Sequence, residues 1–203
     1  MNMTGLKLPE RNGVKDNFND MLTVAKLLHI SLTEIETLGH NGYLSDRIYK
    51  VSVERENNGY RFSVDQKLLA EPYLKTWTCS QSDILHYNEL LIQQNSFGVY
   101  ENNVLIGYAI AEQRDWNNTL YLESLLISQS YRGKGAGKLV IEKLIDHAIM
   151  QGYRLVQLET QNTNFYAIRF YEKCGFEITG INLELYDDTD HDETALYMSY
   201  RLK

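Results

Sequence analysis

The glycine-rich stretch at residues 131–137 constrains this chain more than any other feature. It follows an apolar run, residues 120–127, that reads as a buried strand, and it leads into a helical pattern. Because glycine has no Cβ, the backbone N–H groups of Gly133, Gly135 and Gly137 can converge on an anion at the start of that helix. The helix macrodipole is reinforced there by three cations: Arg132, Lys134 and Lys138. The stretch therefore predicts a cradle for a diphosphate.

Two other nucleotide loops do not fit this stretch. A P-loop requires a Ser or Thr after its Gly-Lys pair, whereas Lys138 is followed by Leu139. A Rossmann turn requires Gly-x-Gly-x-x-Gly, and here the third glycine comes one residue early.

The spacing Arg132-x-x-Gly135-x-Gly137 after a strand resembles the acetyl-CoA pyrophosphate loop of the GNAT superfamily of N-acyltransferases. A second block, residues 164–176 (NFYAIRFYEKCGF), is similar to the helix and turn that follow in that family. The resemblance implies an α/β protein with the GNAT acyl-CoA N-acyltransferase fold, a central mixed twisted β-sheet flanked by helices. In that fold two adjacent parallel strands splay apart around the pantetheine arm.

Shorter strings resemble the streptothricin acetyltransferases, which acetylate a cationic antibiotic. They are Pro72-Tyr-Leu-Lys75, Trp116-Asn117, Leu158-Glu-Thr-Gln161, Asn164, Phe170-Tyr171 and Lys173-Cys-Gly-Phe176. This likeness runs from about Ser45 to the C-terminus. Some enzymes of this group carry a strongly acidic run after the position of Lys75, where this chain reads TWTCSQSD, and this departure concerns the identity of the substrate rather than the chemistry.

The resemblance implies acetyl-CoA as the cosubstrate. We expect no metal, because the spacings of His191 and the aspartates in the acidic run 187–193 form no recognised calcium loop. The residues that the resemblance assigns to acetyl-CoA are Leu125, Leu126, Ile127, Arg132, Gly133, Lys134, Gly135, Ala136, Gly137, Lys138, Asn164, Ala167 and Tyr171. The strand residues would present their backbone to the thioester and pantetheine, and the loop would hold the pyrophosphate.

Acetylation of an amine requires that the ammonium lose a proton and that the departing CoA thiolate gain one. Tyr171 matches the tyrosine that the family places beside the CoA sulfur, and we predict it as the general acid. A phenol pKa of ~10 lies close enough to the thiol pKa of ~8.5 for efficient proton transfer. Direct transfer through a ternary complex needs no enzyme nucleophile.

Two glutamates are candidates for the general base. Glu123 lies on the central strand, where related polyamine-type acetyltransferases place a glutamate, and strand alternation predicts that it shares a face with Leu125 and Ile127. Glu159, on the adjacent strand, is the second candidate. Either carboxylate could act directly or through water, or could only bind the substrate cation.

The predicted activity is acetyl-CoA-dependent N-acetylation of a primary amine on a cationic small molecule, with streptothricin, and hence antibiotic resistance, as the leading substrate. The alternatives are a polyamine or another small amine as acceptor, a protein tail, or a CoA-binding sensor without turnover.

Bulk properties predict one α/β domain over residues 45–203, preceded by a helical extension over residues 1–44. In that extension Met21, Ala25, Leu28, Leu32 and Ile35 have helical spacing. Within the same segment, the sequence Ser31-x-x-Glu34 forms a capping box before a stop at Gly39.

A net charge of −7 argues against nucleic-acid and anionic-membrane partners and is compatible with a cationic substrate. With neither an 18-residue apolar run nor a signal-peptide pattern, and with only two cysteines, we expect a cytoplasmic protein. A homodimer is compatible with the sequence. Cys174, predicted at a helix C-terminus, should have a raised thiol pKa and pack as a small core residue. The acidic run 187–193 reads as a solvated loop that could attract a polycation.

Local patterns predict the remaining elements. Strands are expected at 47–53, 60–64, 97–100, 104–111, 155–160, 176–180 and 194–201, and helices at 84–92 and 164–173, with Pro72 limiting any strand near it.

Overall fold

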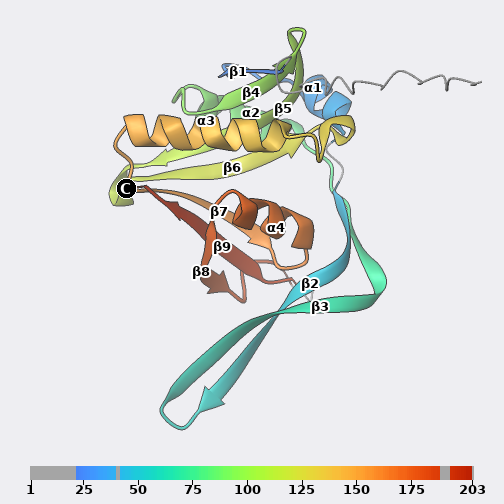
Figure 1. Cartoon of the computed structure of the whole chain (residues 1–203), viewed down its shortest axis with the longest axis vertical. Helices are drawn as coiled ribbons and strands as arrows, with labels where there is room; N and C mark the ends of the chain where they lie inside the picture. Colours follow the sequence, from blue (N-terminus) through green and yellow to red (C-terminus); the bar gives the residue numbers. More distant parts are fainter. Residues whose placement is uncertain (1–21, 40–41, 188–192, 203) are drawn as a thin grey trace, which may run out of the picture.

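The computed structural model describes residues 22–39, 42–187 and 193–202 (Figure 1). The first half contains β1 (Leu22–Lys26), α1 (Leu32–Leu38), β2 (Tyr43–Glu56), β3 (Gly59–Lys75), α2 (Gln81–Leu91), β4 (Phe97–Glu101) and β5 (Val104–Arg114). The second half contains β6 (Thr119–Ile127), α3 (Ala136–Met150), β7 (Leu155–Gln161), α4 (Phe165–Lys173), β8 (Glu177–Asn182) and β9 (Ala195–Arg201).

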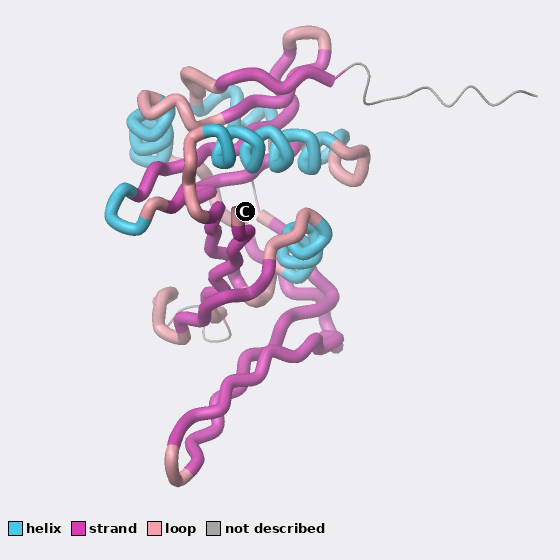
Figure 2. Tube along the Cα trace, turned by 60° about the vertical axis from the view of Figure 1, so that its left-hand side comes forward, coloured by secondary structure: helices cyan, strands magenta, loops and turns pink. Residues whose placement is uncertain are grey.

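Seven strands form one twisted mixed sheet in the order β1-β4-β5-β6-β7-β9-β8. Only β6 and β7 run parallel, as α3 crosses between them, and every other pair is antiparallel. Helices α3 and α4 pack on one face of the sheet, and α1 and α2 pack on the other (Figures 1 and 2). The predicted mixed α/β architecture is confirmed.

Helix α3 forms because its sequence repeats apolar residues on one face. Val140, Ile141 and Leu144 are fully buried against the sheet, as the double stripe predicts. Gly135, with φ +95°, begins the helix, and Gly152, with φ +75°, follows its end. The glycine loop is therefore placed at the positive end of a helix whose position is fixed by burial.

Strands β6 and β7 separate after a short stretch of pairing. Thr119–Leu122 pairs with Leu155–Leu158, and no register is found beyond Leu122. At this point β6 has a bulge against β5: Ala111 lies opposite Leu122 and Ile110 opposite Ser124, so Glu123 is the extra residue. The splay implied by the family resemblance is present.

The bulge also reverses the faces of β6. Leu122 and Leu125 both belong to the side of the core that α3 covers, whereas Leu126 lies in the cluster beneath α1 and α2. The uninterrupted alternation predicted for Glu123, Leu125 and Ile127 is therefore wrong, because the extra residue shifts the pleat by one.

The N-terminal segment differs from the helix predicted over residues 21–35. Leu22–Lys26 is an edge strand paired with β4, because tertiary pairing overrides a helical spacing of five apolar residues. The capping box is correct: the Ser31 side chain accepts from the Glu34 N–H, and the Glu34 carboxylate accepts from the Ser31 N–H at 2.8 Å. The division into an extension and a domain at residue 45 stays a prediction.

Strands β2 and β3 form a two-stranded hairpin that is longer than predicted and stands away from the main sheet (Figures 1 and 2). Pro72 lies inside β3, contrary to prediction. The register jumps from Ser45–Tyr73 to Arg47–Leu68, so Pro72 falls in an irregularity where no ladder N–H is required.

Within the described residues, no helix is long and apolar enough to cross a membrane.

Candidate active site

A cavity of about 800 Å³ opens where β6 leaves β7. Most of the predicted cosubstrate residues line it: Leu125, Leu126, Ile127, Arg132, Gly133, Gly135, Gly137, Lys138, Asn164, Ala167 and Tyr171. The hairpin base and the following turn add Gly42, Tyr43, Leu44 and Trp77. Two predicted residues do not line the cavity: Ala136 is fully buried, and the Lys134 amine lies 5.7 Å from the Tyr131 ring centre.

The loop has the backbone form of an anion cradle. Gly133 and Gly135 both have positive φ, and no described side chain caps α3 at Gly135. The first N–H groups of α3 are therefore available to a ligand. A Cβ at Gly137 would lie 3.1 Å from Phe170 Cζ, so this glycine allows α3 and α4 to approach closely.

Tyr171 reaches the cavity from α4. Its side chain is buried among aromatic rings, with the Phe170 and Phe176 ring centres 5.4 and 5.8 Å away. Burial raises the pKa of the Tyr171 phenol above its ordinary value, and Cys174 and Glu159 add to the rise. The phenol is protonated at neutral pH, but the rise takes its pKa further from that of a CoA thiol than the ordinary phenol value assumed in the sequence-based prediction.

The two candidate bases lie on the other face of the sheet. Leu158 packs beneath α3 and α4, so its neighbour on the strand, Glu159, points to the opposite face of the sheet. There the Glu159 carboxylate accepts a hydrogen bond from the Tyr186 hydroxyl. Exposed Glu123 has an oxygen 3.8 Å from His86 Nε2 on α2. Neither carboxylate lines the cavity that contains Tyr171. The structure gathers the cosubstrate residues with Tyr171 but places both bases across the strand gap.

Burial raises the pKa of Glu159 above its ordinary value. The Tyr186 hydrogen bond opposes this rise, whereas the charges of Glu123 and Glu193 increase it. Glu159 is thus the carboxylate whose surroundings favour taking up a proton.

Glu193 is a buried residue that the sequence patterns did not single out from the acidic run. Its carboxylate lies 2.9 Å from the Lys75 amine and accepts from the hydroxyls of Tyr73 at 2.9 Å, Thr163 at 3.1 Å and Tyr43 at 3.3 Å. Glu193 therefore connects the base of the β2–β3 hairpin with Thr163 in the turn after β7. The central part of the run, residues 188–192, lies outside the described residues.

Cys174 has a thiol pKa raised by burial and by the nearby Glu142 charge, as predicted in direction. It lines the cavity while also packing on the core. Among the described residues, no three His, Cys, Asp or Glu side chains gather as a metal site would need, and the expectation of a metal-free enzyme stays a prediction.

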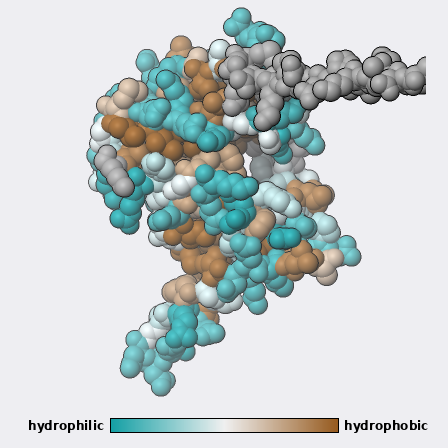
Figure 3. All heavy atoms as spheres, viewed as in Figure 1, coloured by the Kyte–Doolittle hydropathy of each residue, from teal (hydrophilic) through white to brown (hydrophobic). Residues whose placement is uncertain are grey.

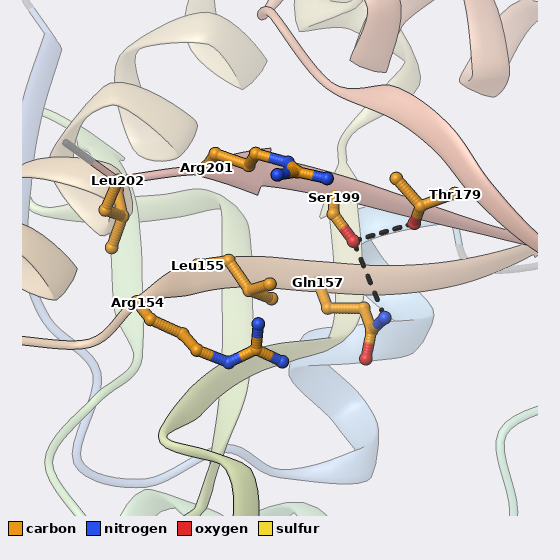
Figure 4. A pocket seen from close by; sticks show the side chains of 7 residues that line it. All are labelled: Arg154, Leu155, Gln157, Thr179, Ser199, Arg201 and Leu202. Atoms are coloured by element: carbon orange, nitrogen blue, oxygen red, sulfur yellow. Dashed lines mark hydrogen bonds between the residues drawn. The ribbon is translucent and has the colours of Figure 1, made fainter.

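A second, polar cavity of about 380 Å³ lies at the opposite end of β7 (Figure 4). Its lining consists of Arg154, Leu155, Gln157, Thr179, Ser199, Arg201 and Leu202. The Ser199 hydroxyl forms a hydrogen bond of 2.8 Å with the Thr179 hydroxyl and accepts one of 3.5 Å from the Gln157 amide. No residue predicted for the site lines this cavity.

The chain belongs to the acetyltransferase (GNAT) family, whose model matches residues 66–176. Streptothricin acetyltransferase of Streptomyces lavendulae is 35% identical over 96 residues, which cover 47% of this chain and 51% of that protein. Spermine/spermidine N(1)-acetyltransferase of Bacillus subtilis is 30% identical over 90 residues, which cover 41% of this chain and 59% of that protein. The chain thus spans about half to three fifths of the length of these two relatives.

Solved structures share the fold. Nourseothricin acetyltransferase matches with a TM-score of 0.69 and 23% identity over 90% of this chain and 99% of that one. A putative streptothricin acetyltransferase from Bacillus anthracis, in complex with acetyl coenzyme A, matches with a TM-score of 0.67 and 24% identity over 90% of this chain and 98% of that one. The predicted GNAT fold is confirmed.

The loop geometry predicts that Gly135→Glu abolishes acetyl-CoA binding, because a side chain at φ +95° is strained and a carboxylate repels the pyrophosphate. We expect a loss of at least about 100-fold in affinity by calorimetry, equivalent to about 2.7 kcal/mol. Gln129→Glu is the control, since it adds the same charge at an exposed position just before the loop. Unchanged affinity in Gly135→Glu would refute the cradle.

The raised pKa of Glu159 predicts a pH-dependent effect on stability. The folded chain holds this proton more tightly than the unfolded chain does, so its stability falls as pH rises above about 4.5, the ordinary value, and through the folded pKa. Glu159→Gln removes that fall and keeps an acceptor for Tyr186. We expect the urea midpoint of the variant, relative to wild type, to rise between pH 4.5 and 7.5, whereas exposed Glu177→Gln gives a smaller trend. Equal pH trends in Glu159→Gln and Glu177→Gln would contradict the raised pKa of Glu159.

Proposed function

We propose that this chain is an acetyl-CoA-dependent N-acetyltransferase that acts on a primary amine of a cationic small molecule, with streptothricin as the leading acceptor. The observation that carries the proposal is the convergence of the glycine cradle, the unpaired end of β6 and the buried Tyr171 phenol on one cavity. The membership of the GNAT family supports the reaction class.

The proposed reaction is a direct transfer between two bound substrates. The loop around Arg132 and Gly135 holds the pyrophosphate, and β6 backbone groups at Leu125–Ile127, unpaired on the β7 side, bind the pantetheine amides. The amine lone pair attacks the thioester carbon, the C–S bond breaks, and Tyr171 gives its proton to the departing thiolate. The acceptor's proton goes to Glu159 or Glu123, directly or through water.

The acceptor would approach from the face opposite α4. Glu123, Glu159 and Glu193 lie near enough on that side for their charges to interact, beside Tyr121 and Tyr186. Carboxylates and aromatic rings together favour an ammonium group over a neutral or anionic one. These features support a cationic acceptor and apply to a polyamine as well as to streptothricin.

The first test is CoA-thiol release from acetyl-CoA with streptothricin, spermidine, an aminoglycoside and a lysine-rich peptide. Turnover with streptothricin alone is expected. If the enzyme prefers spermidine, a polyamine replaces streptothricin as the proposed acceptor, and the proposed reaction, N-acetylation, is unchanged. Acetyl-CoA binding with no release from any acceptor would favour a CoA-binding sensor.

Removal of the Tyr171 hydroxyl tests the general acid. Tyr171→Phe should lower kcat by about 10²–10³-fold and leave acetyl-CoA affinity within about twofold, because the ring still fills its place while the proton donor is lost. Tyr153→Phe, which removes a hydroxyl outside the cavity, is the control. A kcat for Tyr171→Phe equal to that of the control would show that Tyr171 is a packing residue.

A further inference from the structure

The hairpin β2–β3 reaches the candidate active site through its base. Tyr43 and Leu44, the first residues of β2, line the cavity that contains Tyr171, and so does Trp77, which follows the end of β3. The far end of the hairpin stands clear of the body and shows mainly hydrophilic side chains (Figures 1 and 3). The family resemblance assigns none of the three lining residues to acetyl-CoA. The hairpin base therefore gives the cavity a wall whose ligand is still to be assigned.

Two aromatic rings dominate this wall. The Tyr43 and Trp77 ring centres are 5.8 Å apart, and the two ring planes meet at 69°. Rings at such a steep angle form an aromatic corner in which one cation can contact both π systems. Gly42 is required beside the corner, because at φ +113° a Cβ would overlap the Lys75 carbonyl oxygen. The chain that enters β2 thus lies directly against the end of β3, which brings Tyr43 next to Trp77.

Buried hydrogen bonds hold the aromatic corner in place. The Tyr43 hydroxyl lies 2.5 Å from the Thr163 hydroxyl and donates to the Glu193 carboxylate at 3.3 Å. Glu193 is buried, and its carboxylate also lies 2.9 Å from the Lys75 amine. The Tyr43 ring is therefore anchored by an ion pair that is neutral overall. Because the corner is fixed without a ligand, a ligand that binds there loses little free energy to ordering it.

The aromatic corner lies next to the carboxylates on the acceptor side. Burial raises the pKa of the Tyr186 phenol, and its hydrogen bond to Glu159 raises it further. Glu193 and Tyr43 add to this rise, so both lie near the Tyr186 hydroxyl. Tyr43 also lines the cavity that contains Tyr171. The corner thus lies where the cosubstrate cavity meets the side of the sheet that carries Glu159.

We propose that the aromatic corner is the part of the acceptor site that binds an ammonium group of the substrate. Such a role, which rests on the proposed function, gives the enzyme residues that select a cation. Because a cation–π contact favours the charged form, the group held in the corner keeps its proton. It is therefore a second ammonium group of the acceptor and not the amine that attacks the thioester. Glu159, which is hydrogen-bonded to Tyr186, adds the negative charge that the neutral rings lack.

The two tryptophans of the chain give a matched test. Trp77→Leu should raise the KM for the acceptor that wild type acetylates by about tenfold, because leucine keeps an apolar contact but has no π face. The acetyl-CoA dissociation constant, measured by calorimetry, should stay within about twofold of wild type. Trp116→Leu is the same substitution at an 83% exposed position outside the cavity and should leave both constants unchanged. Trp77→Phe restores a ring and should recover part of the loss.

A second measurement does not depend on turnover. Trp116→Leu leaves Trp77 as the single tryptophan, so the fluorescence of this variant reports on the corner alone. Addition of the acceptor to the variant saturated with CoA should change the Trp77 emission. An emission that stays the same while the acceptor is still acetylated would overturn the proposal.

The kinetic comparison can also overturn the proposal. Equal acceptor KM values in Trp77→Leu and Trp116→Leu would do so, and so would a weaker acetyl-CoA affinity with an unchanged acceptor KM, since the corner would then belong to the cosubstrate. If wild type acetylates none of the amines, the proposed function fails, and the role of the corner fails with it. Far-UV circular dichroism shows whether each variant folds. If Trp77→Leu does not fold, Trp77→Phe takes its place, with an expected rise of about threefold in acceptor KM.

Discussion

The separation of β6 from β7 is the constraint on which the site depends. The two strands are parallel neighbours joined through α3, yet they pair only as far as Leu122 and Leu158. Beyond that point the β7-facing N–H and C=O groups of β6 have no strand partner among the described residues, although Leu126 is buried. Buried backbone polar groups need hydrogen-bond partners. A ligand with amides spaced along an extended chain, as in pantetheine, meets that need in the geometry of an added strand.

Helix α4 completes the space that the separated strands leave open. Its position is fixed from several sides, by the close approach of Phe170 to Gly137, by the burial of Ile168, and by the stacking of Phe165 on Tyr49. Tyr171, on the same helix, is thereby held at the cavity with little freedom. The cradle, the strand gap and the proposed acid are thus not independent features, because α4 carries Tyr171, packs against the loop at Gly137 and lines the cavity together with Leu125–Ile127.

Much of this arrangement is predictable from local sequence. The glycine loop, the double stripe of α3 and the block from Asn164 to Phe176 each combine a backbone requirement with a burial pattern, and both point to the same element. Several of the failures share one cause, since they depend on pairing between distant segments. Leu22–Lys26 becomes a strand only through β4, and the bulge at Glu123 exists only in register with β5. The burial of Glu193 cannot be predicted from the acidic run in which it lies. It depends on contacts with Tyr43, Tyr73 and Lys75, which are more than a hundred residues away in the sequence.

The buried Glu193 links the hairpin to the proposed chemistry. Its charge is balanced by Lys75 from β3 and by three hydroxyls, two of them from the hairpin base, while it also raises the pKa of Glu159. Any movement of the hairpin that withdrew Lys75 would leave the charge of Glu193 less compensated, and the repulsion on the carboxylate of Glu159 would grow. The proton affinity of the candidate base is therefore set partly by the position of an element outside the main sheet. This connection gives the hairpin a reason to be anchored firmly at its base, whatever its far end contacts.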